Sequence, residues 1–397
     1  MKILLLNHFP LVGSGSGVYV HNIAKSMVEK GHQVCIIMPE NSTNINCEDS
    51  IKIHPVYFKR EEIIEGQLDF NFPCMDPHPR SNLLFEQMTE IQIQEYVNAF
   101  KKALEEEIKE FNPDIIHAQH IWILSGLLKQ YGIPYVITSH GAEFITYKRT
   151  HRFDSFGMDA ADGCKKIIAI SDDNIKEISE KFPNVTDKII YLKNGYNSTD
   201  FYKAEFDKKE ILNSLGIEKM FDKIVFFVGR LSKLKGLDTL LKAAKIYQSD
   251  NVLTLIAGDG EYKNELELLI KEWNLKNIVF LGNRNHKELN CLYNIADVLV
   301  LPSRKEALPL VAIEAMACGT PVVVSNISGM SDIVKNDIGL LFDVEDEKML
   351  ANQINRILKK EIVFDYEKII NHAKNNYSQD KLIEKLTELY EETRRQN

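Results

Sequence analysis

In this 397-residue chain, the stretch Lys223-Ile224-Val225-Phe226-Phe227-Val228, followed at once by the loop Gly229–Gly236, is the clearest indication of the fold class. The residues after Lys223 are apolar without alternation, which is typical of a parallel strand that is covered on both faces. The glycine-bounded loop leads into a segment with helical periodicity. The stretch therefore predicts a strand, a loop and a helix, which together make one βα unit.

Similar units are predicted on both sides of this stretch. After it we expect strands near 252–257, 277–281, 297–301, 320–324 and 338–342, with helices between them. Before it we expect strands near 2–6, 33–37, 114–117, 134–138, 166–170 and 189–192, and helices near 18–30, 86–111, 122–131 and 172–182. This alternation predicts an α/β protein with two Rossmann-like lobes, each built on a doubly wound parallel sheet.

The length of the chain also favours two domains, because a single hydrophobic core stops growing near roughly 250 to 300 residues. A turn-rich stretch at 194–200 separates the two series of strands. We therefore predict an N-terminal domain over residues 1–200 and a C-terminal domain over residues 201–377. The charged amphipathic helix predicted at 378–397 is expected to pack back onto the first domain.

The composition is that of a folded globular protein, with 44% hydrophobic and 26% charged residues. A net charge of −9 lacks the basic footprint of a nucleic-acid binder. Six cysteines without a C-x-x-C pair predict reduced thiols rather than a zinc knuckle, and no apolar stretch approaches the ~20 residues of a spanning helix. We expect a cytoplasmic protein. A local basic patch is still open as a site of peripheral membrane contact, and its candidates are Lys148, Arg149 and Arg152.

A glycine-rich loop, Gly13-Ser14-Gly15-Ser16-Gly17, lies between the first predicted strand and the first predicted helix. Glycines allow close approach of a ligand to the backbone, and the free N–H groups of a helix start favour an anion. The spacing does not match G-x-G-x-x-G, and the chain contains no P-loop, so neither a dinucleotide nor a P-loop nucleotide site is indicated. A plain strand-to-helix turn remains the alternative.

The loop Gly229–Gly236 carries cations just past the end of a strand, where ligands bind in open α/β sheets. A guanidinium at Arg230 and an ammonium at Lys235 suit a phosphate group. Surface lysines in a loop are also common, so the loop alone leaves a solvated surface as the alternative.

The segment Pro302–Pro321 is the strongest indication of a ligand site. Pro309 fits the first position of a helix, which places Glu306 in the preceding loop and Glu314 on the helix. Free N–H groups at the helix start suit a phosphate, while ionised carboxylates accept hydrogen bonds from sugar hydroxyls. Phosphate and polyol sites side by side are typical of a nucleotide-sugar site.

With these motifs in place, the chain resembles the retaining glycosyltransferases of the GT-B fold, namely glycosyltransferase family 4, or group 1. The resemblance covers nearly the entire sequence. It also includes Gly31–Val34, Ser139–Gly141, Asn194–Gly195, Gly258–Gly260, Tyr293 and Ala296–Asp297. The family implies two Rossmann-like domains that face an interdomain cleft. It implies a hexosyltransferase that uses a nucleoside-diphosphate sugar.

The resemblance also implies roles for individual residues. Arg230 and Lys235 would clamp the donor diphosphate, Glu314 would hold the ribose and Glu306 the hexose. His140 would lie beside the reacting sugar. Further donor contacts are expected from Gly15, Ser16, Gly258, Ala307, Leu308 and Leu310. The sequence departs from many relatives at Pro309, where they have glycine, and at Ser14.

The expected chemistry needs no metal and no cofactor, because no two aspartates are separated by a single residue and the D-x-D signature of metal-dependent transferases is missing. His117 and His120 have a spacing that suits a metal, but no third ligand is evident. The family implies retention of anomeric configuration, with a donor phosphate oxygen receiving the acceptor proton. UDP is the expected nucleoside diphosphate of the donor, and GDP is the second choice.

The acceptor is not identified by the sequence. The irregular segment 58–85 carries Phe72, His78 and Arg80, which we take as candidates for the rim of an acceptor site. A flap that packs over the first sheet is the alternative. A nucleotide-sugar epimerase or hydrolase on the same fold, or an inactive protein that only binds the sugar nucleotide, are the alternatives for the whole chain.

Overall fold

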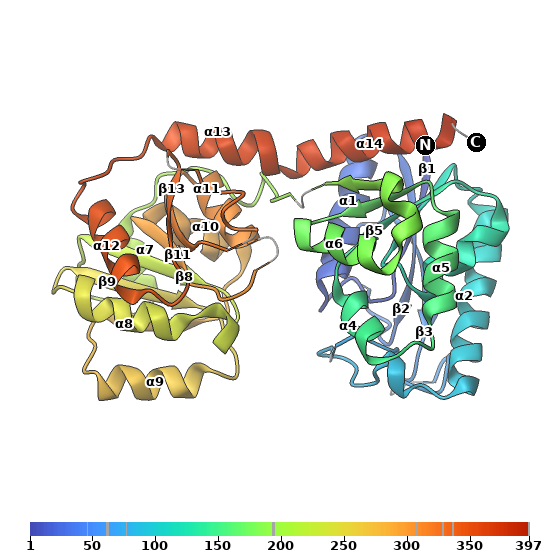
Figure 1. Cartoon of the computed structure of the whole chain (residues 1–397), viewed down its shortest axis with the longest axis horizontal. Helices are drawn as coiled ribbons and strands as arrows, with labels where there is room; N and C mark the ends of the chain where they lie inside the picture. Colours follow the sequence, from blue (N-terminus) through green and yellow to red (C-terminus); the bar gives the residue numbers. More distant parts are fainter. Residues whose placement is uncertain are drawn as a thin grey trace. The chain divides into compact units, whose positions relative to one another are not determined.

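The computed structural model describes residues 1–45, 47–60, 63–76, 78–192, 195–306, 309–327, 329–335 and 337–395. The chain divides into two compact units (Figure 1). Unit 1 comprises Met1–Leu192 and Ile383–Asn397, and unit 2 comprises Lys193–Leu382. Each unit is built around its own sheet of parallel strands, so the predicted pair of α/β lobes is confirmed.

In unit 1 the strands are β1 (Lys2–Leu6), β2 (Gln33–Glu40), β3 (Lys52–Tyr57), β4 (Ile115–Gln119), β5 (Tyr135–Ser139), β6 (Lys166–Ala169) and β7 (Ile189–Tyr191). The helices are α1 (Gly15–Glu29), α2 (Glu90–Glu110), α3 (Ile123–Gly126), α4 (Ala142–Arg149), α5 (Asp154–Gly163) and α6 (Asp172–Lys181). Short 3-10 helices are η1 (Phe85–Gln87), η2 (Leu127–Tyr131) and η3 (Pro183–Lys188).

In unit 2 the strands are β8 (Lys223–Val228), β9 (Val252–Ala257), β10 (Ile278–Gly282), β11 (Val298–Leu301), β12 (Val322–Ser325) and β13 (Gly339–Phe342). The helices are α7 (Lys208–Ser214), α8 (Leu237–Tyr247), α9 (Lys263–Glu272), α10 (His286–Ile295), α11 (Leu310–Ala317), α12 (Glu347–Leu358) and α13 (Tyr366–Tyr377), with η4 at Lys233–Lys235. The last helix, α14 (Gln379–Arg395), begins in unit 2 and continues into unit 1.

Both sheets have the strand order of a doubly wound fold. Unit 1 runs β3-β2-β1-β4-β5-β6-β7, and unit 2 runs β10-β9-β8-β11-β12-β13. In each sheet the direction of winding reverses between two neighbouring strands, β1 and β4 in unit 1 and β8 and β11 in unit 2. The crevice outside the carboxyl ends of such a strand pair is where open α/β sheets bind ligands. This topology therefore fixes where to look for a site in each unit.

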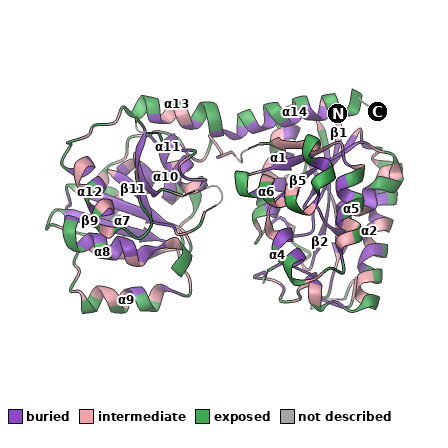
Figure 2. Cartoon of the chain, viewed as in Figure 1, coloured by how far each residue is buried: buried purple, intermediate pink, exposed green. Residues whose placement is uncertain are grey.

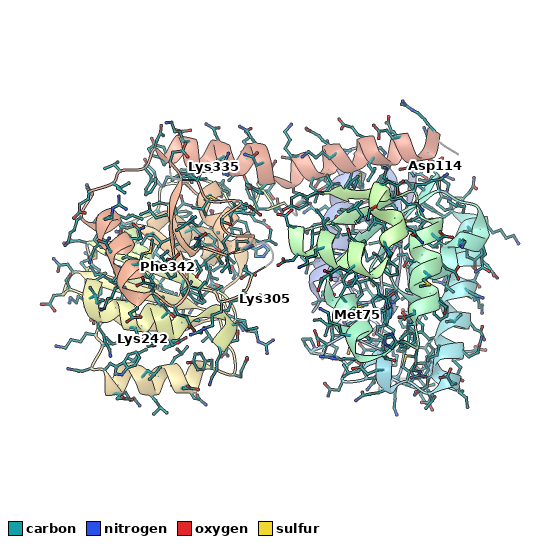
Figure 3. The ribbon with its side chains drawn as sticks, viewed as in Figure 1. Met75, Asp114, Lys242, Lys305, Lys335 and Phe342 are labelled. Carbon is teal, nitrogen blue, oxygen red and sulfur yellow. The ribbon has the colours of Figure 1, made fainter. Side chains whose placement is uncertain are left out.

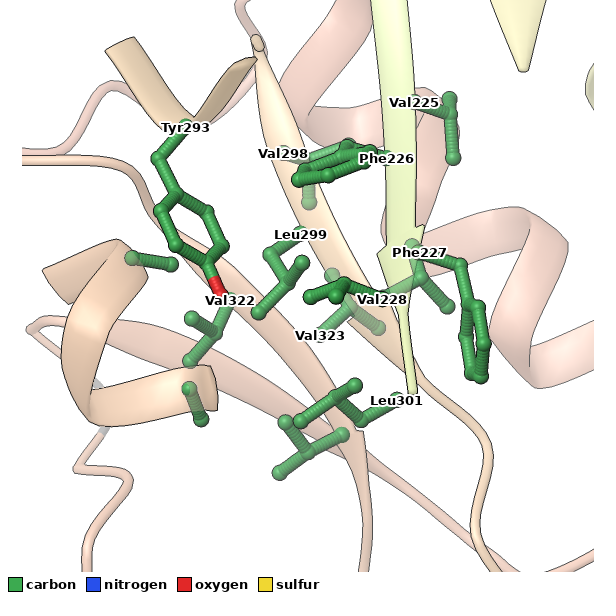
Figure 4. Packing of buried hydrophobic residues seen from close by; sticks show 14 of the residues in the cluster. Val225, Phe226, Phe227, Val228, Tyr293, Val298, Leu299, Leu301, Val322 and Val323 are labelled. Atoms are coloured by element: carbon green, nitrogen blue, oxygen red, sulfur yellow. The ribbon is translucent and has the colours of Figure 1, made fainter. Parts of the chain in front are cut away.

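The central strands are buried because helices cover both faces of each sheet (Figures 1 and 2). In β8 every residue after Lys223 is buried, and β9 and β11 are buried along their whole length. Figure 4 shows how these side chains interlock. The ring of Tyr293 from α10 meets Phe226 edge to face, with their centroids 5.5 Å apart. This packing holds the site loops of unit 2 on a rigid base.

Several elements differ from the sequence-based expectations. β3, α4 and α5 were not predicted, and α1 begins at Gly15 rather than near residue 18. The segment 58–85 has no regular element among its described residues except the start of η1, as expected. Its aromatic side chains are buried, and Phe58 packs edge to face on Phe70 and Phe72. The described part of this segment covers the core of unit 1.

The C-terminal helix α14 is tied into unit 1 by specific contacts of its last three turns. The hydroxyl of Tyr390 lies 2.5 Å from Nδ1 of His117 on β4, and both side chains are buried. Arg394 lies 3.6 Å from Asp114, which Figure 3 labels beside this helix. Across the described residues, no helix combines the length and apolar character needed to cross a membrane.

Candidate functional site

In unit 2 the loops that follow β8 and β11 meet at the reversal of winding. Gly236 has a φ of +66°, and a Cβ there would lie 1.9 Å from the carbonyl oxygen of Pro302. The two backbones therefore approach as closely as only glycine permits. The amide of Arg304 donates to the carbonyl of Leu234 at 2.7 Å. These contacts join the predicted cation loop to the loop that carries Glu306.

Two predicted cations in this region face carboxylates. Lys235 donates a short hydrogen bond to Glu306, and both side chains are mostly buried. Arg230 pairs with Glu261 at 3.2 Å, and there both side chains are exposed. Exposed ion pairs contribute little free energy, so the guanidinium of Arg230 can exchange Glu261 for another anion at small cost.

Glu314 projects from the second turn of α11 and is held by a neighbouring tyrosine. The hydroxyl of Tyr293 donates to its carboxylate at 2.8 Å. Burial raises the pKa of Glu314 above its usual value, and the hydrogen bond from Tyr293 opposes that rise only in part. A partly exposed carboxylate with one oxygen already satisfied is suited to accept hydrogen bonds from a ligand's hydroxyls.

The remaining donor candidates of unit 2 have different surroundings. Gly258 lies in the loop after β9, where a Cβ would meet the carbonyl oxygen of Gly229 at 1.9 Å. Leu310 is the first residue of α11 and packs against the core. Pro309 is the residue before the helix, one position earlier than expected. Ala307 and Leu308 lie outside the described residues.

Arg304 is a residue of this region that sequence reasoning did not single out. Its guanidinium donates two parallel hydrogen bonds to Asp238 of α8, at 2.9 and 2.7 Å, and one to Glu345. It also donates to the carbonyl of Lys233. The guanidinium is therefore occupied by protein partners and fixes the two loops to α8. The neighbouring Lys305, labelled in Figure 3, is exposed.

In unit 1 the glycine loop forms the start of α1. The side chain of Ser14 caps the helix by accepting a hydrogen bond from the amide of Gly17 at 3.0 Å. Gly15 is exposed, and a Cβ there would meet nothing within 4 Å. Ser16 is buried, and within the described structure its hydroxyl has no hydrogen-bond partner. The loop thus offers an open backbone next to an unsatisfied hydroxyl.

His140 follows β5 and is fixed by a residue from the neighbouring strand. Its Nε2 lies 2.9 Å from the side-chain oxygen of Gln119 at the end of β4. Burial, followed by the charge of His120, lowers the pKa of His140 to about 3. The imidazole is therefore neutral at physiological pH and can act through hydrogen bonds rather than through charge.

A second histidine stands beside His140. The two rings of His120 and His140 have centroids 4.9 Å apart. His120 has a φ of +66°, and its Nδ1 lies 2.9 Å from the buried carboxylate of Glu143. Among the described residues, neither Nε2 of His120 nor the side-chain nitrogen of Gln119 has a hydrogen-bond partner. Two buried polar atoms next to His140 are thus left for a ligand.

Glu143 orients His120 through a buried network. Burial opposes ionisation of this carboxyl, but the charge and hydrogen bond of His120 and a hydrogen bond from Ser139 outweigh it and lower its pKa to about 2. Ser139 donates to Glu143 at 2.6 Å and accepts from Asn174 at 2.8 Å. The contacts within this set were not predicted, because three members lie on α4, β5 and α6 and His120 lies in the loop after β4.

The residues proposed for the acceptor rim are largely buried. Phe72 is fully buried and packs on the ring of Phe58 and on that of His78. His78 lies against Gly13 of the glycine loop, where an added Cβ would approach its ring to 2.7 Å. Arg80 pairs with the buried Glu40. The described flap therefore supports the glycine loop, and the side chain of Phe72 belongs to the core.

The basic residues Lys148, Arg149 and Arg152 do not form a free cationic patch. Lys148 pairs with Glu177 at 3.3 Å, Arg149 with Asp76 and Glu86 at 3.4 Å, and Arg152 with Glu90 at 2.5 Å. Their charges are balanced by neighbouring carboxylates. His117 of the predicted histidine pair bonds Thr138 and Tyr390, so it is occupied as well.

Two family models match this chain, one in each half. The model described as Glycosyltransferase Family 4 matches residues 13–200, and the model described as Glycosyl transferases group 1 matches residues 207–393. An uncharacterized glycosyltransferase of Methanocaldococcus jannaschii is 27% identical over 98% of both chains.

Solved structures resemble the whole chain. A glycosyltransferase from Rickettsia africae matches with a TM-score of 0.75 and 19% identity, over 99% of this chain and 98% of that one. Anabaena HepE in complex with UDP matches with a TM-score of 0.74 and 17% identity, over 99% and 100%. At such identities the likeness shows the fold, which confirms the predicted GT-B class.

Proposed function

Because the chain belongs to the glycosyltransferases, with a family 4 N-terminal half and a group 1 C-terminal half, we propose that it is a retaining hexosyltransferase. It takes a hexosyl unit from a nucleoside-diphosphate sugar and passes it to a hydroxyl of an acceptor, without a metal ion. The observation that carries this proposal is the junction of the loops after β8 and β11. There cations and carboxylates project from one rigid edge of the unit 2 sheet.

In this proposal the donor exchanges the ion pairs of the free protein for its own groups. When the donor binds, its diphosphate replaces Glu261 as the ion-pair partner of Arg230 and Glu306 as the partner of Lys235. Glu306, once released by Lys235, accepts hydrogen bonds from the hexose hydroxyls. The existing Lys235–Glu306 contact supports this exchange, because it holds both side chains within reach of the same loop junction.

The nucleoside is recognised through its ribose. Glu314, fixed by Tyr293, accepts hydrogen bonds from the ribose hydroxyls. UDP is the expected carrier, and the likeness to a protein solved with UDP supports this choice, with GDP as the second carrier to test.

The bond that breaks joins the anomeric carbon of the hexose to the donor phosphate, and the new bond joins that carbon to the acceptor oxygen on the same face. Negative charge grows on the leaving phosphate, where Arg230 and Lys235 stabilise it as fixed cations. A phosphate oxygen of the donor receives the acceptor proton. The neutral imidazole of His140 supplies a hydrogen bond to the reacting sugar.

We place the acceptor hydroxyl in unit 1 beside His140. The unpartnered nitrogens of Gln119 and His120 support this placement. A buried polar atom without a hydrogen bond costs free energy, and a ligand hydroxyl that bonds these nitrogens removes that cost. The free state of all six cysteines is consistent with a reducing compartment, and we propose the cytoplasm.

The test of the proposal is release of nucleoside diphosphate from a panel of UDP- and GDP-sugars, with and without candidate acceptors. We expect release that depends on an acceptor and continues in EDTA. Arg230→Ala is expected to lower the rate by about 100-fold or more, as loss of one stabilising donor does elsewhere. Lys233→Ala is the matched control, since Lys233 lies in the same loop but pairs with Glu265 on α9.

Two results would count against the proposal. Turnover of the donor that is equally fast without acceptor would indicate a hydrolase or an epimerase. Donor binding without any release would indicate an inactive binding protein.

A further inference from the structure

Three side chains of different chemistry converge on one point of unit 1, and none of them has a role in the proposed function. His21 projects from α1, while Cys47 and Glu48 lie in the segment between β2 and β3. Nε2 of His21 is 2.7 Å from Oε2 of Glu48, and Sγ of Cys47 is 3.8 Å from the same oxygen. All three donor atoms lie within 4.8 Å of one another.

We propose that His21, Cys47 and Glu48 form a binding site for a divalent transition-metal ion of the zinc class. A nitrogen, a thiolate sulfur and a carboxylate oxygen are the ligands that zinc takes in proteins, whereas magnesium and calcium prefer oxygen alone. The mixed set therefore selects a borderline-soft ion. Three protein ligands leave the fourth tetrahedral position to water.

The observed distances suit this geometry with small movements. Zinc lies about 2.0 to 2.3 Å from such ligands, so two of them in a tetrahedron are about 3.4 to 3.6 Å apart. The Sγ–Oε2 distance of 3.8 Å is already close to this value. The Nε2–Oε2 distance of 2.7 Å is that of a hydrogen bond, and it opens when the ion replaces the shared proton.

The second oxygen of Glu48 has its own partner. Lys25, one turn after His21 on α1, lies 3.9 Å from Oε1. The carboxylate therefore binds the ion through Oε2 alone while Lys25 faces the other oxygen. An outer partner of this kind is common around metal ligands, because it fixes the orientation of the ligand.

Binding of the ion releases a proton from the thiol. The ion takes the thiolate, and the proton leaves to solvent. The ion then joins α1, which carries the glycine loop at its start, to the segment between β2 and β3.

This site is separate from the proposed transfer chemistry, so it is tested without a donor or an acceptor. The metal-free full-length protein is titrated with Co²⁺, and Zn²⁺ affinity is measured by competition with a metal-binding dye. We expect one equivalent of Co²⁺ to give the near-ultraviolet absorption of a thiolate–cobalt bond. Cys47→Ser is expected to abolish this absorption and to weaken Zn²⁺ binding about tenfold or more.

Cys291→Ser is the matched control, because Cys291 is also a free and partly exposed thiol but lies on α10. It should leave both signals unchanged. His21→Gln and Glu48→Gln should weaken Zn²⁺ binding while the thiolate band persists at high Co²⁺. Absence of a thiolate band in the unmodified protein, or equal Zn²⁺ affinity in Cys47→Ser, would overturn the proposal. Circular dichroism of each variant verifies that it is folded.

Discussion

The hydroxyl of Tyr293 holds the carboxylate that the proposed donor site uses for the ribose. The tyrosine is fully buried, so its position is set by the core of unit 2 and not by the ligand. A carboxylate that is already oriented loses less conformational freedom when the ligand binds. The tyrosine therefore acts on the donor through Glu314.

Tyr293→Phe removes this hydrogen bond and leaves the ring in place. We expect donor affinity to fall by about tenfold or more, because a hydrogen bond to a charged group contributes about 1.5 to 3 kcal/mol. Isothermal titration with the nucleoside diphosphate measures the loss.

The control for this variant is Tyr247→Phe. Tyr247 is buried in the same unit, and its hydroxyl bonds Thr254 at 2.9 Å, so the variant also loses one buried hydrogen bond. It should lower thermal stability without changing donor affinity. An equal loss of affinity in both variants would show that the effect comes from general destabilisation.

Buried histidines make the stability of unit 1 sensitive to acid. Burial lowers the pKa of His117 from 6.5 to about 3, and that of His140 to about 3 as well. The unfolded chain takes up protons on them below pH 6.5, whereas the folded protein does not until about pH 3. Their contribution to stability is therefore full above pH 6.5 and is lost as the pH falls toward 3.

Each such histidine steepens the pH dependence by up to about 1.4 kcal/mol per pH unit. The free energy of unfolding of unit 1 should fall between pH 6 and pH 5. We expect His117→Gln to make this fall smaller by about 1.4 kcal/mol. Hydrogen exchange at β4 and β5 measures it. His151→Gln, at an exposed position, is the control, and parallel curves for His117→Gln and the unmodified protein would contradict the assignment.

Some functional residues carry a local signal in the sequence and others do not. Glu306 and Glu314 were predicted because a proline and a strand–loop–helix pattern surround them. His120 was considered only as half of a metal pair, because its contact with Glu143 depends on a left-handed backbone at His120 and on the position of helix α4. Arg304 was missed for a similar reason, since its partner Asp238 is 66 residues away.

At the scale of elements, the donor site of unit 2 depends on how closely its loops approach. Gly236 brings the loop after β8 against Pro302, and the backbone there is left-handed. A side chain at this position meets both a strained φ and a carbonyl oxygen. The cost of the strained φ can be separated from the cost of the steric clash by comparison with a glycine that has a positive φ but no close neighbour.

Gly236→Ala is expected to displace the loop that carries Lys235, lowering donor affinity by more than about tenfold. Gly216→Ala is the matched control, because Gly216 has a φ of +76° with nothing within 4 Å of an added Cβ. It should cost about 1 to 2 kcal/mol of stability and leave donor affinity unchanged. If Gly236→Ala behaves like Gly216→Ala, the close approach of the loops does not position the site.

The strands were predictable where they are covered on both faces, because their apolar runs are continuous. β3 was missed because it is an edge strand with a different pattern. Its first half carries the polar residues Lys52 and His54, and it contains Pro55, which an edge strand tolerates. The short helices α4 and α5 follow His140, and the apolar residues of their sequences are not confined to one helical face, unlike those of the equally short α6, which was predicted.

At the scale of the whole molecule, the two compact units do not follow the order of the chain. Unit 1 is completed by Ile383–Asn397, which come after all of unit 2. Ile383, Leu386 and Tyr390 of this segment are fully buried. The far end of the sequence is thus part of the first core.

Leu386→Ala should therefore destabilise unit 1, although the residue lies 194 positions beyond Leu192. We expect a loss of about 2 to 5 kcal/mol, as for other buried leucines. Limited proteolysis should cut more rapidly within residues 1–192. Leu268→Ala, at an exposed position on α9, is the control, and protection equal to that of the unmodified protein in both variants would contradict the role of α14.

The passage of α14 into unit 1 also affects how the protein is made. During translation the residues of Lys193–Leu382 must be added before Ile383–Asn397 can leave the ribosome, which takes about 10 to 40 s at ordinary elongation rates. For that period the nascent first unit lacks the helix that covers Met27 and His117. Release of the growing polypeptide before its final fifteen residues would yield a complete second unit beside an unfinished first one.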